Sequence, residues 1–232
     1  MNVFALDCSA AAASVAVFGD GCLLGEQFVN TAETHSRTLL PMAQHLLEAL
    51  NLGLTEMDYF AISRGPGSFT GLRIGIAAVK GMAFPQNTPC IGVSTLEGLA
   101  FRFLGFEGTI AAVMDARCKQ VYGALFAVHE GNITRMTEDA ALPLSEFGAA
   151  MADLPGPIWL AGDGAALCYE SLHQGLPALR LAPEPLRFQH AAGVGMAALT
   201  HLAEAVAPAA LMPSYLRPVH AATLAERQKN EL

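Results

Sequence analysis

Two aspartates, each at the end of an apolar run, are the residues best placed for chemistry in this sequence. Asp7 ends the run NVFALD, and Asp115 ends the run TIAAVMD. Both runs are typical of buried strands, and carboxylates at strand ends can hold a hydrated divalent cation. Aspartates in such places also serve as ordinary turn and cap residues. The pattern therefore allows a cation site without requiring one.

The stretch RGPGSFTGLRIG, residues 64–75, has the glycine and hydroxyl content of a phosphate-binding loop. It carries no lysine at the start of the following helix, which a P-loop requires. Its spacing, Gly65-x-Gly67-x-x-x-Gly71, also differs from that of a dinucleotide-binding loop. Amides at the start of a helix over 71–84 could still attract an anion. We favour the alternative, a tight crossing from strand to helix that needs small residues for packing.

The histidines and cysteines add no obvious reactive group. The seven histidines include no pair spaced four apart on a predicted helix, and no nucleophile-elbow motif is present. The five cysteines are odd in number and form no C-x-x-C pair, so we expect reduced, buried thiols. These cysteines are Cys8, Cys22, Cys90, Cys118 and Cys168.

Composition narrows the class of protein. The chain has 232 residues, of which 53% are hydrophobic and 15% charged, and its formal net charge is −8. With only 13 Lys and Arg it is poorly suited to be a primary nucleic-acid binder, although a local basic spot remains open. No signal peptide is evident, and His201, Glu204 and Pro208 interrupt the late apolar stretch 191–211. We expect an Ala-rich helix there, in a cytoplasmic protein without membrane contact.

Hydrophobic periodicity predicts the elements that must position these residues. The first half reads as three strands, then helix, strand, helix, strand and helix, at 2–7, 14–18, 22–29, 36–51, 58–64, 71–84, 89–93 and 94–103. Gly19-Asp20-Gly21 marks a hairpin turn, and a Ser or Thr caps the last helix. The second half restarts this order, with strands at 109–116, 120–128, 133–137 and 157–161 and a helix after Gly162-Asp163-Gly164.

The two halves share one plan. FALDCSAAAASVAVF and AAVMDARCKQVYGALF each read as an apolar strand, a terminal aspartate, a short connection and a second apolar strand. We infer an internal duplication of one β-β-β-α-β-α unit. The expected lobes are residues 1–106, which carry the partner-binding helices, and residues 107–232, which end in a helix and a tail. Two α/β lobes across a cleft resemble the actin, hexokinase and Hsp70 (ASKHA) group.

In that group, strand-ending aspartates and a late Gly-x-Gly turn surround a nucleotide. By analogy, the candidate nucleotide-binding residues are Asp7, Ser9, Asp115, Gly162 and Gly164. The loop after Asp7, however, continues with four alanines, 10–13, before the next serine. Methyl groups crowd an anion there and donate no hydrogen bond. We therefore expect ATP to bind weakly or not at all.

Four stretches together, RGPGSFTGLRIG, IGVSTLEGLA, MDARCKQVY and PSYLRP, resemble the TsaB (YeaZ) family of bacterial threonylcarbamoyladenosine synthesis. The resemblance covers nearly the whole chain. It implies a non-catalytic paralogue of TsaD, the enzyme that transfers a threonylcarbamoyl group to the adenosine following the anticodon. One departure is the alanine run after Ser9, where relatives commonly carry Thr or Glu.

The resemblance also implies what this chain lacks. TsaD holds its metal with two histidines four apart, on the helix that follows a G-V strand. The corresponding positions here are Thr95 and Leu99, which cannot bind an ion as a histidine pair does. We therefore expect no metal, no cofactor and no catalytic residue. Descriptions of such proteins as peptidases find no support in these residues.

The two helices of the first half are unusually apolar for helices that cover one side of a sheet. Packing on each other and on the sheet accounts for part of this excess, and a leftover apolar patch marks a partner site. The resemblance implies helix-mediated pairing with TsaD. The predicted partner-interface residues are Leu39, Met42, Leu46 and Leu50 on the first helix and Gly71, Gly75, Ala78 and Met82 on the second.

The resulting prediction is a scaffold and activator of TsaD. By resemblance its partners also include the ATPase TsaE, a second copy of itself when alone, and tRNA through the assembly only. One alternative is a free-standing ATP-dependent kinase or hydrolase that uses Asp7 and Asp115. Another is a tRNA-binding module, which a basic stripe would favour and the net charge disfavours.

Overall fold

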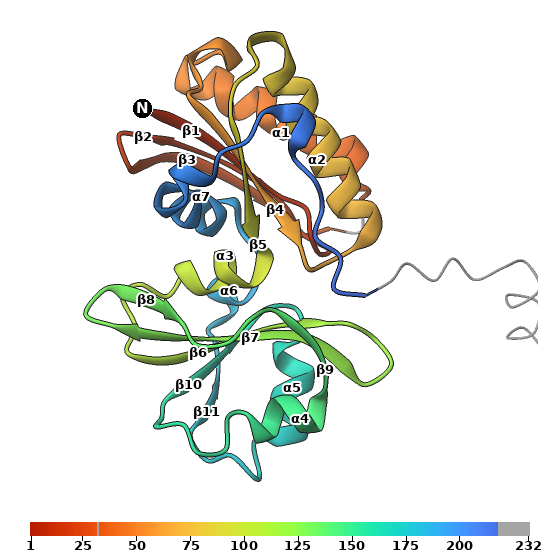
Figure 1. Cartoon of the computed structure of the whole chain (residues 1–232), viewed down its shortest axis with the longest axis vertical. Coiled ribbons are helices and arrows are strands. Elements are labelled where there is room, and N and C mark those ends of the chain that lie inside the picture. Colours follow the sequence, from red (N-terminus) through yellow and green to blue (C-terminus); the bar gives the residue numbers. More distant parts are fainter. Residues whose placement is uncertain (32, 218–232) are drawn as a thin grey trace, which may run out of the picture.

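Two α/β lobes, each built on one mixed sheet, make up the computed structural model (Figure 1). The structure describes residues 1–31 and 33–217. The first sheet has the strand order β3-β2-β1-β4-β5. Its strands are β1 (Asn2–Asp7), β2 (Ala13–Gly19), β3 (Cys22–Val29), β4 (Tyr59–Gly65) and β5 (Cys90–Ser94).

The second sheet repeats this plan, with the order β11-β10-β6-β7-β8 and with β9 paired to β7. In each sheet the first three strands in sequence pair antiparallel, and two later strands extend the sheet in parallel on the other side of the first strand, whereas β9 pairs antiparallel with β7. This confirms the α/β class and the duplicated, two-lobed, actin-like plan. The strands are β6 (Gly108–Asp115), β7 (Gln120–His129), β8 (Asn132–Arg135), β9 (Ala140–Pro143), β10 (Ile158–Ala161) and β11 (Leu179–Leu181).

Successive side chains of each strand point to opposite faces of the sheet, and helices cover both faces. In β1, Phe4 and Leu6 pack against α1 and α2, whereas Val3 and Ala5 pack against α7. In the second lobe, α3 covers one face of the sheet, and α4 and α5 cover the other (Figure 1). The helices are α1 (His35–Leu50), α2 (Phe69–Ala83), α3 (Thr95–Phe101), α4 (Leu144–Ala149), α5 (Ala165–Leu172), α6 (Glu184–Arg187) and α7 (Ala191–Thr200).

Helices α3 and α7 lie between the two sheets and cross each other closely (Figure 1). A methyl group added at Gly193 of α7 would lie 2.1 Å from the carbonyl oxygen of Gly98 of α3. Since α7 belongs to the core of the first sheet and α3 to that of the second, this crossing joins the lobes. Small residues are required there because the two backbones touch.

The chain returns to the first lobe after the second sheet is complete. Helix α7 packs on the first sheet, Val206 bridges to Cys90 of β5, and Leu211 enters the core beneath α2. Two 3₁₀ turns, Leu202–Glu204 and Pro208–Ala210, lie in this segment. We keep the division into residues 1–106 and 107–232 as a proposal, with two refinements: α3 covers the second sheet, and the segment 191–211 packs on the first.

Several predicted boundaries differ from the structure. Helix α2 begins at Phe69 instead of residue 71, because Ser68 caps it by accepting a hydrogen bond from the Gly71 amide at 3.2 Å. The predicted helix over 191–211 ends at Thr200 and gives way to 3₁₀ turns. The Gly19–Gly21 hairpin turn and the Ser94 cap of α3 are confirmed. Among the described residues, every helix is too short or too polar to cross a bilayer.

Candidate functional site

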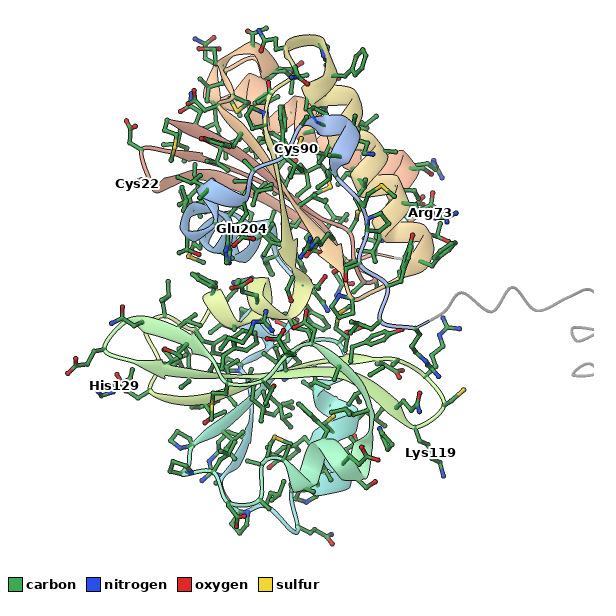
Figure 2. All side chains as sticks on the ribbon, viewed as in Figure 1. Cys22, Arg73, Cys90, Lys119, His129 and Glu204 are labelled. Atoms are coloured by element: carbon green, nitrogen blue, oxygen red, sulfur yellow. The ribbon has the colours of Figure 1, made fainter. Side chains whose placement is uncertain are left out.

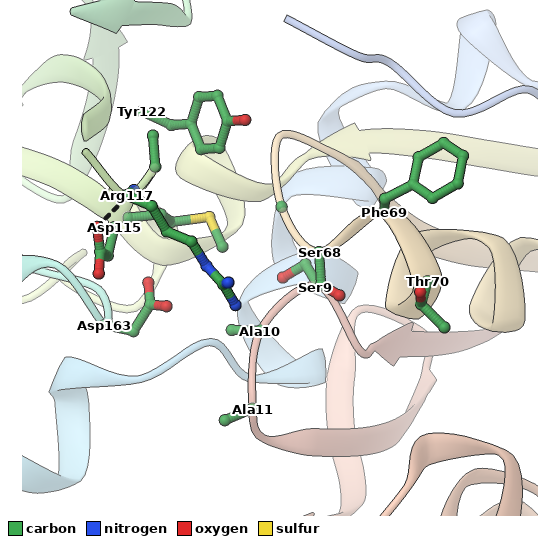
Figure 3. Close-up of a pocket in the computed structure, with 13 residues that line it drawn as sticks. Ser9, Ala10, Ala11, Ser68, Phe69, Thr70, Asp115, Arg117, Tyr122 and Asp163 are labelled. Carbon is green, nitrogen blue, oxygen red and sulfur yellow. Dashed lines mark hydrogen bonds between the residues drawn. The ribbon is translucent and has the colours of Figure 1, made fainter. Parts of the chain in front are cut away.

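A cleft of about 640 Å³ opens at the carboxyl ends of β1, β4, β6 and β10, where ligands bind in many open α/β sheets (Figure 3). The first lobe contributes hydroxyl groups to it, and the second lobe contributes the carboxylates of Asp115 and Asp163. The Arg117 side chain extends across it toward Ala10. The lining residues are Ser9, Ala10, Ala11, Gly67, Ser68, Phe69, Thr70, Met114, Asp115, Ala116, Arg117, Tyr122 and Asp163.

Asp7 is sealed off from this cleft. Its side chain accepts hydrogen bonds from the Ser9 amide at 2.9 Å, from the Ser9 hydroxyl at 2.8 Å and from the Ser63 hydroxyl. The residue is only 1% exposed. Burial raises the pKa of the Asp7 carboxyl, against the opposing effect of these hydrogen bonds. A ligand in the cleft therefore has no open path to Asp7, and Asp7 and Asp115 do not form a shared carboxylate pair.

The glycine loop packs against the backbone that follows Asp7. The Ser68 amide donates to the Ser9 carbonyl oxygen at 2.7 Å, and a methyl group at Gly67 would lie 2.4 Å from that same oxygen. A methyl group at Gly71 would lie 2.2 Å from the Cys8 carbonyl oxygen. Because these neighbours are backbone atoms, only glycine fits. These contacts confirm the packing interpretation of the loop.

The second lobe closes the cleft with two tight turns. In the β6–β7 turn, Asp115 accepts the Arg117 amide at 2.7 Å, and residues 117–119 all have positive φ, at 62°, 53° and 60°. In the β10–α5 turn, a methyl group at Gly162 would lie 1.9 Å from the Val113 carbonyl oxygen. Gly164 likewise packs on the backbone of β6. Both glycines thus serve the close approach of two backbones.

These contacts test whether the cleft fits the nucleotide that its fold group commonly holds. The amide and hydroxyl of Ser9, which would have to face a phosphate, are both engaged by Asp7. Ala10 and Ala11 present methyl groups to the cleft instead. The loop after Asp7 therefore does not fit a nucleotide phosphate, because its Ser9 donors are bound to Asp7 and its next two residues offer only methyl groups.

The positions that correspond to the metal-binding histidines of TsaD are interior. Thr95 and Leu99 are each 1% exposed, and Leu99 packs in the same core cluster as Phe103 and Ile110. Within residues 1–31 and 33–217, no three His, Cys, Asp or Glu side chains gather in a way that could hold a metal ion. Leucine offers no ligand atom and a threonine hydroxyl is no substitute for an imidazole, so these two residues do not fit the metal that a histidine pair holds.

The structure corrects the prediction for the cysteines in part. Cys8, Cys90 and Cys168 are buried, and burial raises the pKa of their thiols to about 12, 11 and 12. Cys22 and Cys118 are exposed, because each lies at a hairpin turn. All five are free thiols.

The predicted partner surface on α1 and α2 is largely interior. Leu39, Met42 and Leu46 pack in the core on the first sheet, while Gly71 and Gly75 face Cys8. These five residues are needed to seat the helices on the sheet, so the structure moves them from surface to core. Only three of the eight predicted residues are partly exposed, namely Leu50, Ala78 and Met82.

An apolar groove remains open between α1 and α2, and of its lining residues only Met82 was predicted from the sequence. Its volume is about 320 Å³, and Leu40 at its edge is 52% exposed. The pair Leu39-Leu40 was the available signal, because two successive helical residues cannot both face one sheet. The groove is lined by Leu40, Ala43, Gln44, Leu47, Glu48, Leu52, Leu54 and Met82.

Comparison with known proteins agrees with this architecture. The family profile described as "TsaD: tRNA N6-adenosine threonylcarbamoyltransferase" matches residues 29–222. The solved structure "YeaZ from Pseudomonas aeruginosa" superposes with a TM-score of 0.75 at 29% identity, covering 93% of this chain and 99% of that chain.

Two curated relatives carry the name "tRNA threonylcarbamoyladenosine biosynthesis protein TsaB". The protein from Buchnera aphidicola subsp. Schizaphis graminum is 35% identical over 168 residues, 70% of this chain and 78% of the relative. The protein from Escherichia coli is 38% identical over 145 residues, 61% of this chain. That match spans 62% of the length of the E. coli protein. The chain belongs to the TsaB (YeaZ) family.

Proposed function

We propose that this chain is a non-catalytic subunit that pairs with TsaD for the threonylcarbamoylation of the adenosine following the anticodon in tRNA. The names of its relatives support the pathway, and the interior positions of Thr95 and Leu99 support the absence of TsaD-type metal chemistry. The groove between α1 and α2 is the observation that carries the pairing.

The groove has the shape and composition that a partner helix requires. Leu40, Leu52, Leu54 and Met82 give it an apolar wall, and Gln44 and Glu48 give it a polar rim. An apolar centre with a polar margin is the usual anatomy of a protein–protein contact. An exposed leucine that lines a concavity gains more from a partner than one on a flat surface, because its remaining surface can be covered completely.

The outward side of α2 allows close approach. Ala77 and Gly81 are exposed, and a methyl group at Gly81 would meet nothing within 4 Å. Small side chains let two helix backbones come near each other. Ala78 and Met82, which are partly exposed, lie on the same helix. The partner surface that we propose therefore comprises the groove together with Leu50, Ala77, Ala78 and Gly81.

The enzyme alternative, an ATP-dependent kinase or hydrolase, has weaker support. It needs Asp7 beside a phosphate, and Asp7 is enclosed by donors from Ser9 and Ser63. Pairing with TsaE, self-pairing of the isolated chain, tRNA contact within the assembly and a cytoplasmic location complete the proposal. They rest on the family resemblance.

Size-exclusion chromatography with purified TsaD tests the proposal. We expect the two chains to co-elute as one species, and we expect the lone chain to neither hydrolyse ATP nor modify tRNA. A lone chain that hydrolyses ATP, and loses this activity on Asp7→Asn substitution, would support the enzyme alternative instead. Separate elution of the two chains at micromolar concentration would refute the pairing.

A further inference from the structure

Cations and aromatic rings gather at the opening of the cleft, on a chain whose net charge is −8. Arg117 and Tyr122 come from the second lobe and Phe69 from the start of α2, and all three line the cleft. Arg73, which Figure 2 shows beside α2, lies over the Phe69 ring. We call this surface the cleft-mouth patch, and define it as Phe69, Arg73, Arg117, Tyr122, Tyr215 and Arg217.

The segment that ends the described chain ties this patch together across the two lobes. The Ser214 amide donates to the Arg64 carbonyl oxygen of the first lobe at 2.7 Å. Three residues later, the Arg217 guanidinium donates to the Ala116 carbonyl oxygen of the second lobe at 2.8 Å. The segment therefore crosses the cleft mouth, with Tyr215 beside α2 of the first lobe and Arg217 beside the β6–β7 turn of the second.

Within the patch, two aromatic rings and a guanidinium form a platform. The Phe69 and Tyr215 ring centroids are 5.1 Å apart, and the Arg73 guanidinium lies 3.9 Å from the Phe69 centroid. The Arg73 Nε also donates to the Tyr215 hydroxyl at 3.1 Å. Tyr215 remains 36% exposed. Rings held in place with a free face are the usual stacking partners of unpaired bases.

The cations of the patch are available for phosphates. None of Arg73, Arg117 and Arg217 forms an ion pair with a carboxylate in the described part of the chain. The Asp115 and Asp163 carboxylates lie inside the cleft, where they repel a phosphate. A negatively charged backbone is therefore favoured along the rim and disfavoured in the interior.

We propose that the cleft-mouth patch binds a single-stranded segment of RNA, with phosphates along the cations and one base stacked on the Tyr215–Phe69 platform. A duplex fits less well, because its bases are not free to stack on a side chain. This inference rests on the proposed function, which makes the anticodon loop of tRNA the RNA in question. It assigns this chain a direct RNA contact of its own.

Fluorescence anisotropy with a labelled anticodon stem-loop tests the proposal, using both the complex with TsaD and the chain alone. Tyr215→Ala should weaken binding by about tenfold, while Tyr215→Phe, which keeps the ring, should bind like the wild type. Arg117→Gln should lower the slope of log affinity against log salt by about 0.7, the value for one phosphate contact. Arg180→Gln on β11, far from the patch, is the matched control for a lost charge.

These experiments distinguish a failure of the RNA contact from a failure of the proposed pairing with TsaD. If the chain fails to pair with TsaD, the proposed function fails, and titration of the chain alone still decides the RNA contact. The RNA contact is overturned if Tyr215→Ala and Arg117→Gln both behave like Arg180→Gln. It is equally overturned if neither the chain nor its complex binds the stem-loop, or if Tyr215→Phe loses as much affinity as Tyr215→Ala.

Discussion

Replacing Gly193 by alanine should destabilise the protein, whereas the same change at Gly98, across the same helix crossing, should not. A methyl group at Gly193 would lie 2.1 Å from the Gly98 carbonyl oxygen, whereas ordinary contact begins near 3.4 Å. A methyl group at Gly98 meets the Val194 Cγ2 atom at 3.3 Å, the end of a side chain that can adjust. The two substitutions therefore differ in what must move.

The expected change in the free energy of unfolding for each variant is the sum of two opposing effects. Alanine in place of glycine inside a helix stabilises by about 1 kcal/mol, and both sites are helical. At Gly193, overpacking against a backbone atom adds a cost of about 2–4 kcal/mol, because α3 and α7 must separate while each remains seated on its own sheet. We expect Gly98→Ala to be neutral to slightly stabilising and Gly193→Ala to be destabilised by about 1–3 kcal/mol.

Thermal and urea melts followed by circular dichroism measure the difference. For a chain of this size, about 1 kcal/mol shifts the melting midpoint by roughly 2–4 °C, so the overpacking cost of about 2–4 kcal/mol should separate the two variants by about 4–16 °C. Equal midpoints for the two variants would refute the reasoning, since steric contact at Gly193 is what separates them. A more stable Gly193→Ala variant would show that the helices are not in backbone contact.

Other substitutions test other contacts. Gly71→Ala should destabilise the protein, because the new methyl group meets the Cys8 carbonyl oxygen. Gly81→Ala should be neutral or stabilising, because its methyl group meets nothing within 4 Å. Urea titrations compare the free energies of unfolding of the two variants. Burial opposes protonation of His201, but its hydrogen bonds and charge interactions with Glu97 and Glu204 raise its pKa above the ordinary 6.5. The protonated His201 therefore stabilises the folded state below pH 6.5, and this stabilisation is lost as the pH rises through the raised pKa. His201→Gln should therefore lower the melting midpoint more at about pH 5.5 than at about pH 8.5, and an equal loss would contradict this. Calorimetric titration of the chain with ATP should show at most weak binding, and micromolar affinity abolished by Asp7→Asn would overturn that expectation.

Local pattern was enough to predict most of the first sheet. Alternating residues and the Gly19–Gly21 turn specify the hairpin of β2 and β3, because both signals act over a few residues. The repeated run from an apolar strand to Asp7 and to Asp115 likewise revealed the duplication. Each of these signals lies within one or two neighbouring elements, so it can be recognised without knowing which distant elements pack against them.

Contacts between elements that lie far apart in the sequence could not be predicted in the same way. Helix α7 is buried nearly all round, and its sequence indicates burial without indicating which sheet it covers. Its return to the first lobe depends on contacts with β1 and β2, more than 170 residues earlier in the chain. The sealing of Asp7 depends in the same way on Ser63, which comes from another strand.

The candidate partner surface shows that the same limit applies to the individual residues of α1 and α2. Periodicity identified α1 and α2 as too apolar, but it could not divide their residues between sheet and solvent. Met42 was a natural choice for a surface substitution, yet it is 6% exposed and packs on the first sheet. Leu40, its neighbour two positions before, is the residue left open.

The affinity of this chain for TsaD after a single substitution in the groove tests the central claim most directly. Leu40→Glu places a charge where a partner helix would bury it, and Leu167→Glu on α5 is a matched control, because Leu167 is a helical leucine of similar exposure in the second lobe. By isothermal titration calorimetry, Leu40→Glu should bind TsaD at least about a hundredfold more weakly than wild type, while remaining folded by circular dichroism. Leu167→Glu should bind like the wild type. A folded Leu40→Glu variant that binds TsaD with wild-type affinity would contradict the assignment of the groove.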